Sequence, residues 1–352
     1  MTNTHFRVLM VGSAERSGGG VASVIRTMKQ MPLWKIFHCG WLGTQIQRGY
    51  TVKIGYALKA YGIAFFSLWR YDIVHFHIVP DRIGLLIQMP VFLLARLLRK
   101  KIILQIHMGN QLSKHTSNKL FLWHLRRANL IVLLAPKWQK MFKDWYPTIT
   151  TPITVVYNAM ATVKKVENNE KEKLIIMAAY LNNNKAPDVL LRAWKSIHMR
   201  YPDWRIEMLG NGEVERFRKM SEEMGLHDSV SFSGYVTGEK KETVFRKASI
   251  LCLCSYEEGF PMVAIEAWAY GICLVTTPVG GLPDVLEHGR NALTFDFGDS
   301  DALAKCLEQL MGSEEQRQAM ANYSRHFVYE HFSMDIINEK WQNIYNKLLT
   351  GK

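Results

Sequence analysis

A strand–helix–strand unit between residues 249 and 281 constrains the fold of this chain more than any other stretch. Ile250–Cys254 is apolar throughout and does not alternate, as expected for a parallel strand buried on both faces. A Glu-Glu-Gly-Phe-Pro turn follows, and the pattern predicts a helix over Pro261–Tyr270 that Gly271 ends in the left-handed conformation. Ile272–Thr276 is the expected next strand. The unit predicts an α/β fold with a ligand site at the carboxyl edge of a parallel sheet.

Two carboxylates belong to this unit, Glu258 in the turn and Glu266 about one helical turn into the helix. Both can border the positive end of the helix, where backbone amides bind phosphate. Carboxylates there can accept hydrogen bonds from sugar hydroxyls, so the pattern predicts a cradle for a sugar nucleotide. The alternative is that Glu266 is the polar face of an amphipathic helix and Glu258 a solvated loop charge. Spacing alone does not decide between the two.

The run Glu-Gly-Phe-Pro-Met-Val-Ala-Ile-Glu-Ala, followed by Gly271 and by Gly280–Asp284, resembles the donor-site signature of retaining glycosyltransferase family 4. The resemblance implies the α/β GT-B fold: two Rossmann-like domains with parallel sheets facing a central cleft, and a C-terminal helix that crosses back to the first domain. It implies that Glu258 contacts the transferred sugar and Glu266 the ribose hydroxyls. The other donor contacts that it implies in this stretch are Gly259, Phe260, Pro261, Met262 and Val263.

The length of 352 residues exceeds what one hydrophobic core usually supports, so two domains are expected. With the resemblance, residues 1–165 become a Rossmann-like acceptor-binding domain and residues 174–332 a Rossmann-like domain for the nucleotide sugar. The short charged stretch 166–173 is the expected linker, and residues 333–352 are the expected crossing helix.

Charge and cysteine content indicate which partners and which cellular compartment to expect. Residues 1–165 contain 23 Lys and Arg against 4 Asp and Glu, a net +19 within a total of +13. Such a domain attracts nucleic acid, polyphosphate or an anionic membrane, and no RNA-binding or zinc-finger signature is present, so we do not expect nucleic acid. The alternative is a basic face for solubility or for an anionic acceptor. Five cysteines without paired spacing favour a reducing compartment, and we expect a cytoplasmic protein, peripheral on the membrane.

A glycine-rich loop and a histidine are the candidate site residues of the N-terminal half. His5–Val11 predicts a first strand that leads into the glycines Gly18, Gly19 and Gly20, whose backbone can approach a phosphate closely. In the resembled family, a Gly-Gly pair here faces the donor diphosphate. Ile102–His107 predicts another strand, and the resemblance places a histidine at its end in the active site, which indicates His107. We do not expect His75 and His77 to take part directly.

The C-terminal half supplies further donor contacts and one departure from the family pattern. The resemblance assigns Lys185 to the donor diphosphate, and Gly210, Gly212, Tyr235 and Val236 to the nucleobase pocket. Tyr180, however, occupies the place of the family's arginine, and Ala186 that of a glycine. A tyrosine carries no charge and cannot form a bidentate pair. Either another arginine such as Arg16 compensates, or phosphate binding is weakened, or the protein no longer transfers sugar.

One of two helical stretches in the N-terminal half, and one carboxylate pair, have competing interpretations. Lys53–Trp69 predicts a helix, and Arg82–Arg99, with Pro90 near its middle, predicts either a buried crossover helix or a surface segment in the membrane interface. Asp299 and Asp301 mimic a metal-binding pair, but Asp299 or Ser300 more simply caps the next helix. We expect no metal ion.

The sequence therefore predicts a retaining glycosyltransferase of the EC 2.4 class. It would move a sugar from a UDP- or GDP-type nucleotide-diphospho-sugar to a glycan or lipid-linked glycan, as in bacterial surface polysaccharide synthesis. The donor is a substrate, and no cofactor is expected. Two alternatives remain: a non-catalytic GT-B partner protein, because of Tyr180, and a sugar-nucleotide epimerase of the same fold.

Overall fold

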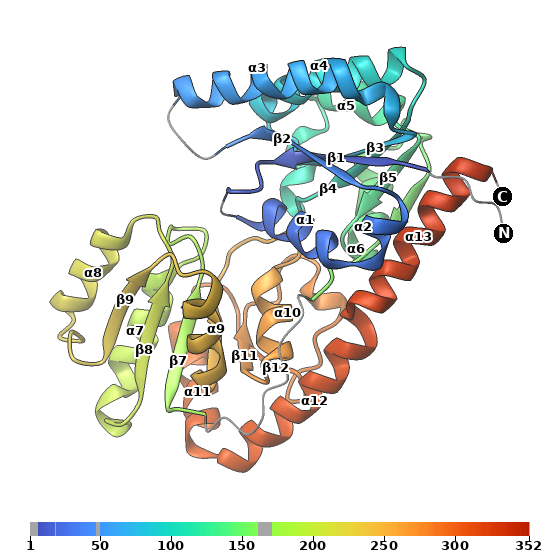
Figure 1. Cartoon of the computed structure of the whole chain (residues 1–352). Helices are drawn as coiled ribbons and strands as arrows, with labels where there is room; N and C mark the ends of the chain where they lie inside the picture. Colours follow the sequence, from blue (N-terminus) through green and yellow to red (C-terminus); the bar gives the residue numbers. More distant parts are fainter. Residues whose placement is uncertain (1–5, 18, 47–49, 161–170, 352) are drawn as a thin grey trace. The chain divides into compact units, whose positions relative to one another are not determined.

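The computed structural model describes residues 6–17, 19–46, 50–160 and 171–351. They divide into two compact units, Met1–Ala159 with Phe332–Lys352, and Met160–His331. Each unit contains a six-stranded sheet in which all neighbouring strands are parallel (Figure 1). The α/β class expected from the sequence is confirmed. Of the expected linker 166–173, residues 166–170 lie outside the described part of the chain.

The sheet of the first unit has the order β2-β1-β3-β4-β5-β6. Its strands are β1 (Val8–Ser13), β2 (Gly40–Gln45), β3 (Ile73–Ile78), β4 (Lys101–Ile106), β5 (Leu130–Leu133) and β6 (Ile153–Val155). Its helices are α1 (Gly20–Gln30), α2 (Pro32–Ile36), α3 (Tyr50–Ser67), α4 (Arg82–Leu97), α5 (Lys119–Arg127), α6 (Pro136–Trp145) and α13 (Met334–Thr350).

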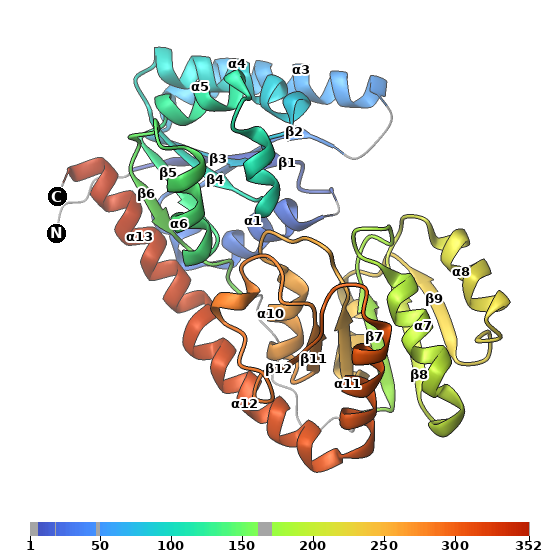
Figure 2. The ribbon, with the colours of Figure 1, turned by 180° about the vertical axis from the view of Figure 1, so that it is seen from behind.

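Strand β3 shows how this sheet is covered on both faces. Its side chains alternate, so that Phe76 packs against Phe92 of α4, with ring centroids 5.4 Å apart. His75 points the other way and packs against Trp341 of α13 at 4.7 Å. Both views place α3, α4 and α5 on one face of the sheet and α1 and α6 on the other (Figures 1 and 2).

The second unit has the strand order β12-β11-β10-β7-β8-β9. Its strands are β7 (Leu174–Ala178), β8 (Arg205–Leu209), β9 (Val230–Gly234), β10 (Ile250–Leu253), β11 (Cys273–Thr276) and β12 (Ala292–Thr294). Its helices are α7 (Pro187–Ile197), α8 (Val214–Glu223), α9 (Gly238–Lys247), α10 (Met262–Ala269), α11 (Ser300–Gly312) and α12 (Glu314–Phe332). One core joins α7, α8 and α11 to the sheet through Trp194, Phe217 and Leu307.

The helix bounds differ from the expectations by a few residues, for local reasons. Pro261 precedes α10 as its N-cap in an extended conformation, so the helix begins at Met262. Gly271 follows α10 with φ of 62°, as the sequence predicts. Helix α3 begins at Tyr50 and ends at Ser67, and a 3₁₀ turn over Leu68–Arg70 completes the stretch expected to be helical up to Trp69. Helix α4 stops at Leu97 before the left-handed Arg99.

The C-terminal helix α13 belongs to the first unit, as the family resemblance implies. Its side chains Trp341 and Tyr345 are fully buried there. Asn338 is also buried, and its Oδ1 accepts a hydrogen bond of 2.8 Å from the backbone amide of Leu33 in α2. This bond satisfies one of the otherwise unbonded amides in the first turn of α2.

We predict that Asn338→Ala destabilises the first unit by about 1–3 kcal/mol, because it leaves the buried Leu33 amide without an acceptor. Urea unfolding followed by circular dichroism measures the loss. Asn343→Ala, an exposed position on the same helix, is the matched control and should change stability by less than about 0.5 kcal/mol. Equal stability of the two variants would contradict the anchoring role of Asn338.

Candidate functional site

The strand order of the second sheet brings two loops together. From β7 the chain continues to β8 and β9 on one side, and it then crosses to β10, β11 and β12 on the other. The loops that follow the neighbouring strands β7 and β10 therefore begin side by side at the carboxyl edge. In open α/β sheets, this switch point is where ligands bind.

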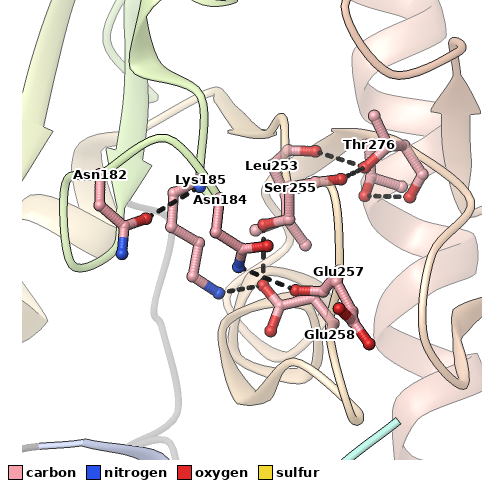
Figure 3. Close-up of polar contacts among 9 residues, drawn as sticks. Asn182, Asn184, Lys185, Leu253, Ser255, Glu257, Glu258 and Thr276 are labelled. Carbon is pink, nitrogen blue, oxygen red and sulfur yellow. Dashed lines mark hydrogen bonds and ion pairs between the residues drawn. The ribbon is translucent and has the colours of Figure 1, made fainter. Parts of the chain in front are cut away.

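Lys185 and Glu258 meet at this switch point. The Lys185 ammonium, from the loop after β7, forms an ion pair with Glu258 Oε1, from the loop after β10 (Figure 3). The same carboxylate oxygen accepts a hydrogen bond of 2.8 Å from Ser255 Oγ. The two charged side chains are only 20% and 12% exposed. The structure thus brings together two predicted site residues that are 73 positions apart.

Asparagine side chains and backbone bonds hold the two loops in register (Figure 3). Asn184 Nδ2 donates to the backbone carbonyl of Glu257 at 3.0 Å, and the Tyr256 amide donates to the Asn184 carbonyl at 2.7 Å. Asn182 Oδ1 accepts from the Lys185 amide at 3.1 Å. Ala186 is left-handed, with φ of 47°, so this non-glycine residue stores backbone strain directly beside Lys185.

The loop after β11 fixes the turn that carries Glu258. The Gly281 amide donates to the Gly259 carbonyl at 2.9 Å. Gly280 has φ of 67°, and a Cβ there would lie 2.7 Å from the Glu258 carbonyl oxygen, so only glycine fits. Phe260 and Pro261 are buried, and Met262 and Val263 begin α10 without a side-chain cap within the described chain. The amides of this first turn can bind an anion.

Glu266 has a partner that the sequence analysis missed. Its Oε1 lies 2.6 Å from Nζ of Lys241 in α9, and the Glu266 side chain is 15% exposed. Lys241 lies in the helix that precedes β10 in the sequence, and Glu266 lies in the helix that follows it. The two residues are 25 positions apart, so no local spacing indicated this pair. Glu266 is therefore a largely covered carboxylate that already has a lysine partner.

Backbone hydrogen bonds join the loops after β7 and β8, where Gly210 and Gly212 of the predicted nucleobase pocket lie. The Leu181 amide donates to the Asn211 carbonyl at 2.7 Å, and the Glu213 amide donates to the Leu181 carbonyl at 2.8 Å. Gly212 has φ of 119°, and a Cβ there would clash with the Leu181 backbone. Gly210 lies at the same loop, immediately after β8. Close backbone approach, which only glycine allows, accounts for Gly212 without a ligand.

Exposed aromatic rings and a second cation border these loops. Tyr180 and Tyr235 are 62% and 53% exposed, and Val236 next to Tyr235 is half-buried. Arg216 of α8 donates from Nη1 to Asn183 Oδ1 at 2.8 Å. Arg216 is thus a cation in direct contact with the loop that carries Lys185, and the sequence analysis did not single it out. The exposed faces of the two tyrosines can stack on a planar ring.

The glycine-rich loop belongs to the first unit and precedes α1. Gly18 lies outside the described residues, while Gly19 and Gly20 are exposed at the helix start. Arg26 of α1 holds the loop, because its Nη1 donates to the carbonyls of Glu15 at 2.8 Å and Ser17 at 3.0 Å.

His107 ends a column of three histidines in the first unit. His77 Nδ1 and His107 Nε2 share a hydrogen bond of 2.9 Å, and the His75 and His77 rings stack with centroids 4.4 Å apart. His75 Nδ1 in turn shares a 2.9 Å hydrogen bond with Tyr345 Oη of α13. His75 and His77 are buried, whereas His107 is half-buried. The column connects the C-terminal helix to the predicted site residue.

Burial keeps this column neutral. It lowers the pKa of His75 to about 3, with a smaller contribution from neighbouring His107, and it holds the pKa of His77 well below its ordinary value of 6.5. Burial also lowers the pKa of His107. A neutral His107 can donate one hydrogen bond to a hydroxyl but supplies no positive charge for a phosphate.

Of the two carboxylates near residue 300, Asp299 caps helix α11. Asp299 Oδ1 accepts a 2.8 Å hydrogen bond from the Ala302 amide at the start of α11. Throughout the residues that the structure describes, no group of three or more His, Cys, Asp or Glu side chains is placed to hold a metal ion.

Comparison with known sequences connects the second unit to a family. Residues 160–327 match the family model described as glycosyl transferases group 1. An uncharacterized glycosyltransferase of Haemophilus influenzae is 30% identical over 211 residues, 59% of this chain and 57% of that protein. A Campylobacter jejuni N-acetyl-D-galactosaminyltransferase, named for an undecaprenol diphosphate-linked substrate, is 28% identical over 49% of this chain and 47% of its own length. The chain spans about half the length of these curated relatives.

Comparison with solved structures covers both units. The crystal structure of Anabaena HepE in complex with UDP-glucose aligns with a TM-score of 0.75 at 15% identity, over 97% of this chain and 100% of that chain. This is the GT-B fold. Its two Rossmann-like domains correspond to the two parallel six-stranded sheets.

We predict that the stability of the N-terminal unit of this GT-B protein falls below about pH 6.5. The unfolded chain protonates its histidines near that pH, while the folded column stays neutral down to about pH 3, so acid favours unfolding. The slope of the unfolding free energy against pH should be smaller in His75→Phe, by about 1.4 kcal/mol per pH unit between about pH 6 and 5. Native-state hydrogen exchange of β3 peptides, corrected for the intrinsic exchange rate, measures it.

Tyr345→Phe is the matched control, because it removes the same hydrogen bond and leaves the titrating ring in place. It should lower stability at every pH without changing the slope. Identical slopes for wild type and His75→Phe would contradict the neutral column.

Proposed function

We propose that this chain is a retaining glycosyltransferase that moves a sugar from a nucleotide-diphospho-sugar to a glycan or lipid-linked glycan. The observation that supports it best is the Lys185–Glu258 pair at the switch point of the second sheet, beside the first turn of α10. It combines a cation and the backbone amides of a helix start, which can bind phosphate, with a carboxylate that can bind hydroxyl groups. The match to glycosyl transferases group 1 covers the same residues.

We assign the donor to the second unit. A diphosphate entering the switch point would take over the Lys185 ammonium from Glu258, and Glu258 would then accept from hydroxyls of the transferred sugar. Glu266, held by Lys241, would bind the ribose hydroxyls. Tyr180, Tyr235 and Val236, with the loop from Gly210 to Gly212, are the proposed surroundings of the nucleobase.

In the transfer step, the bond between sugar and diphosphate breaks, the sugar becomes positive, and the diphosphate gains negative charge. Lys185 and the amides of Met262 and Val263 would stabilise that charge, which is the largest contribution that fixed groups usually make to catalysis. The departing phosphate would take the proton of the acceptor hydroxyl, so retention needs no carboxylate nucleophile. His107, which is neutral, and the Gly19–Gly20 turn remain predictions for the N-terminal unit.

We propose a lipid-linked acceptor on the cytoplasmic face of a membrane, in surface polysaccharide synthesis. The net charge of +19 in residues 1–165 suits a diphosphate-linked lipid or an anionic bilayer. The Campylobacter jejuni relative carries the name of such a lipid substrate. The donor nucleotide is of the UDP or GDP type; HepE in the structural comparison binds UDP-glucose.

A non-catalytic partner protein is the second candidate, and Tyr180 favours it. This exposed, uncharged side chain stands where the resembled family has an arginine. Arg216, which contacts Asn183 and forms an ion pair with Glu213, is a cation of this unit that could replace the arginine. The epimerase alternative has no such observation in its favour.

We predict conversion of one UDP- or GDP-sugar only when an oligosaccharide-diphosphate lipid is present, with the anomeric configuration of the donor retained in the product. Proton NMR of the reaction measures both. Lys185→Gln should lower kcat about 10²–10³-fold. Lys195→Gln, an exposed lysine on α7, is the control and should be unaffected. Nucleotide binding without turnover would favour the non-catalytic protein, and conversion without acceptor an epimerase.

A further inference from the structure

Helix α3 is built the opposite way from an ordinary surface helix. The residues that it buries against the sheet are small, namely Ala57, Ala60 and Ala64. Its large apolar side chains point outward: Phe65 is 68% and Phe66 75% exposed. Val52, Ile54, Leu58 and Ile63 are exposed as well. A helix whose partner were only the sheet would place the large side chains inside and polar ones outside.

Helix α4 continues this apolar surface. Ile83, Leu86, Leu93 and Leu97 are 49–78% exposed and recur at helical spacing, so they form one stripe. The two helices are joined where Tyr61 Oη of α3 donates to the Ile87 carbonyl of α4 at 2.9 Å. Both views show α3 and α4 on the same outer side of their sheet (Figures 1 and 2). Together these exposed residues of α3 and α4 make up one surface, which we call the α3–α4 face.

The charged residues of α3 and α4 are all basic. Neither α3 nor α4 contains an Asp or a Glu. Lys53 and Lys59 of α3 and Arg82 and Arg96 of α4 are exposed. Just after α3, the Arg70 guanidinium lies 5.1 Å from the centre of the Trp69 ring, which is itself exposed. Tryptophan beside a cation is typical of the boundary between lipid tails and headgroups.

We propose that the α3–α4 face docks on an anionic lipid bilayer, with both helices lying in the plane of the interface. Apolar side chains enter the acyl boundary, and the basic side chains contact anionic headgroups. In the described part of the chain, no helix has the length and apolar content to cross a membrane. Docking by helices that lie on the surface agrees with that finding.

A lipid surface fits the α3–α4 face better than a protein does. Protein interfaces combine apolar centres with paired polar rims, whereas here the outward residues over two helices are apolar or cationic and offer no acceptor carboxylate. The inference rests on the proposed function, because docking on a bilayer would bring the protein to a lipid-linked acceptor. The docking itself requires neither donor nor acceptor.

Vesicle flotation with the full chain tests the inference. We expect wild type to float with phosphatidylcholine vesicles containing phosphatidylglycerol, more weakly in high salt, and poorly with phosphatidylcholine alone. The combined variant Phe65→Ser, Phe66→Ser and Leu97→Ser should lower the partition coefficient about tenfold or more. Lys53→Gln with Lys59→Gln should lower it about fivefold per lysine and weaken its salt dependence.

The control is Met199→Ser with Phe297→Ser, which removes exposed apolar side chains from the second unit and should leave flotation unchanged. Circular dichroism shows that each variant is folded. The inference is overturned if wild type fails to float, or if the combined Phe65, Phe66 and Leu97 serine variant (the face variant) floats as well as wild type. A dimer in sedimentation that the face variant dissociates also overturns it, since a second copy would then cover the face. Sugar transfer that persists in such a result leaves the proposed function standing.

Discussion

The parallel pairing of β7 with β10 is the constraint on which the candidate site depends. Parallel neighbours end at the same edge of a sheet, so the chain can leave β7 with Lys185 and, 73 residues later, leave β10 with Glu258 beside it. The glycines of the loop after β11 then hold the Glu258 turn, because Gly280 has no side chain and its backbone can pack directly against the backbone of Glu258. Cation, carboxylates and helix start are thus positioned by the sheet and not by the flexible length of the side chains.

Residues close in sequence could be placed from the sequence, and partners distant in sequence could not. The run from Ile250 to Thr276 predicts its strand, helix and strand with errors of one residue, because apolar runs, a proline and a left-handed glycine act locally. The pairing of Lys241 with Glu266 and the column from Tyr345 to His107 join elements whose neighbourhood depends on strand order and helix packing. No spacing in the chain carries that information.

The two units place charge in contrasting ways. In the second, each site carboxylate already has a lysine partner, so neither is a lone buried charge. In the first, the basic residues of α3 and α4 accompany large apolar side chains turned away from the core. The function that we propose, which joins a water-soluble donor to a lipid-linked acceptor, would use the paired charges of the second unit for the donor and the α3–α4 face for the lipid.

The central claim is that the second unit binds a nucleoside diphosphate through Glu266, and calorimetric titration with UDP, GDP and ADP tests it most directly. We expect one of the nucleotides to bind, and Glu266→Gln to weaken its binding by about 1.5–3 kcal/mol through loss of a charge-assisted hydrogen bond. Glu239→Gln, at an exposed position of α9, should bind like wild type. Unchanged affinity of Glu266→Gln, or no binding of any nucleotide to wild type, would contradict the account.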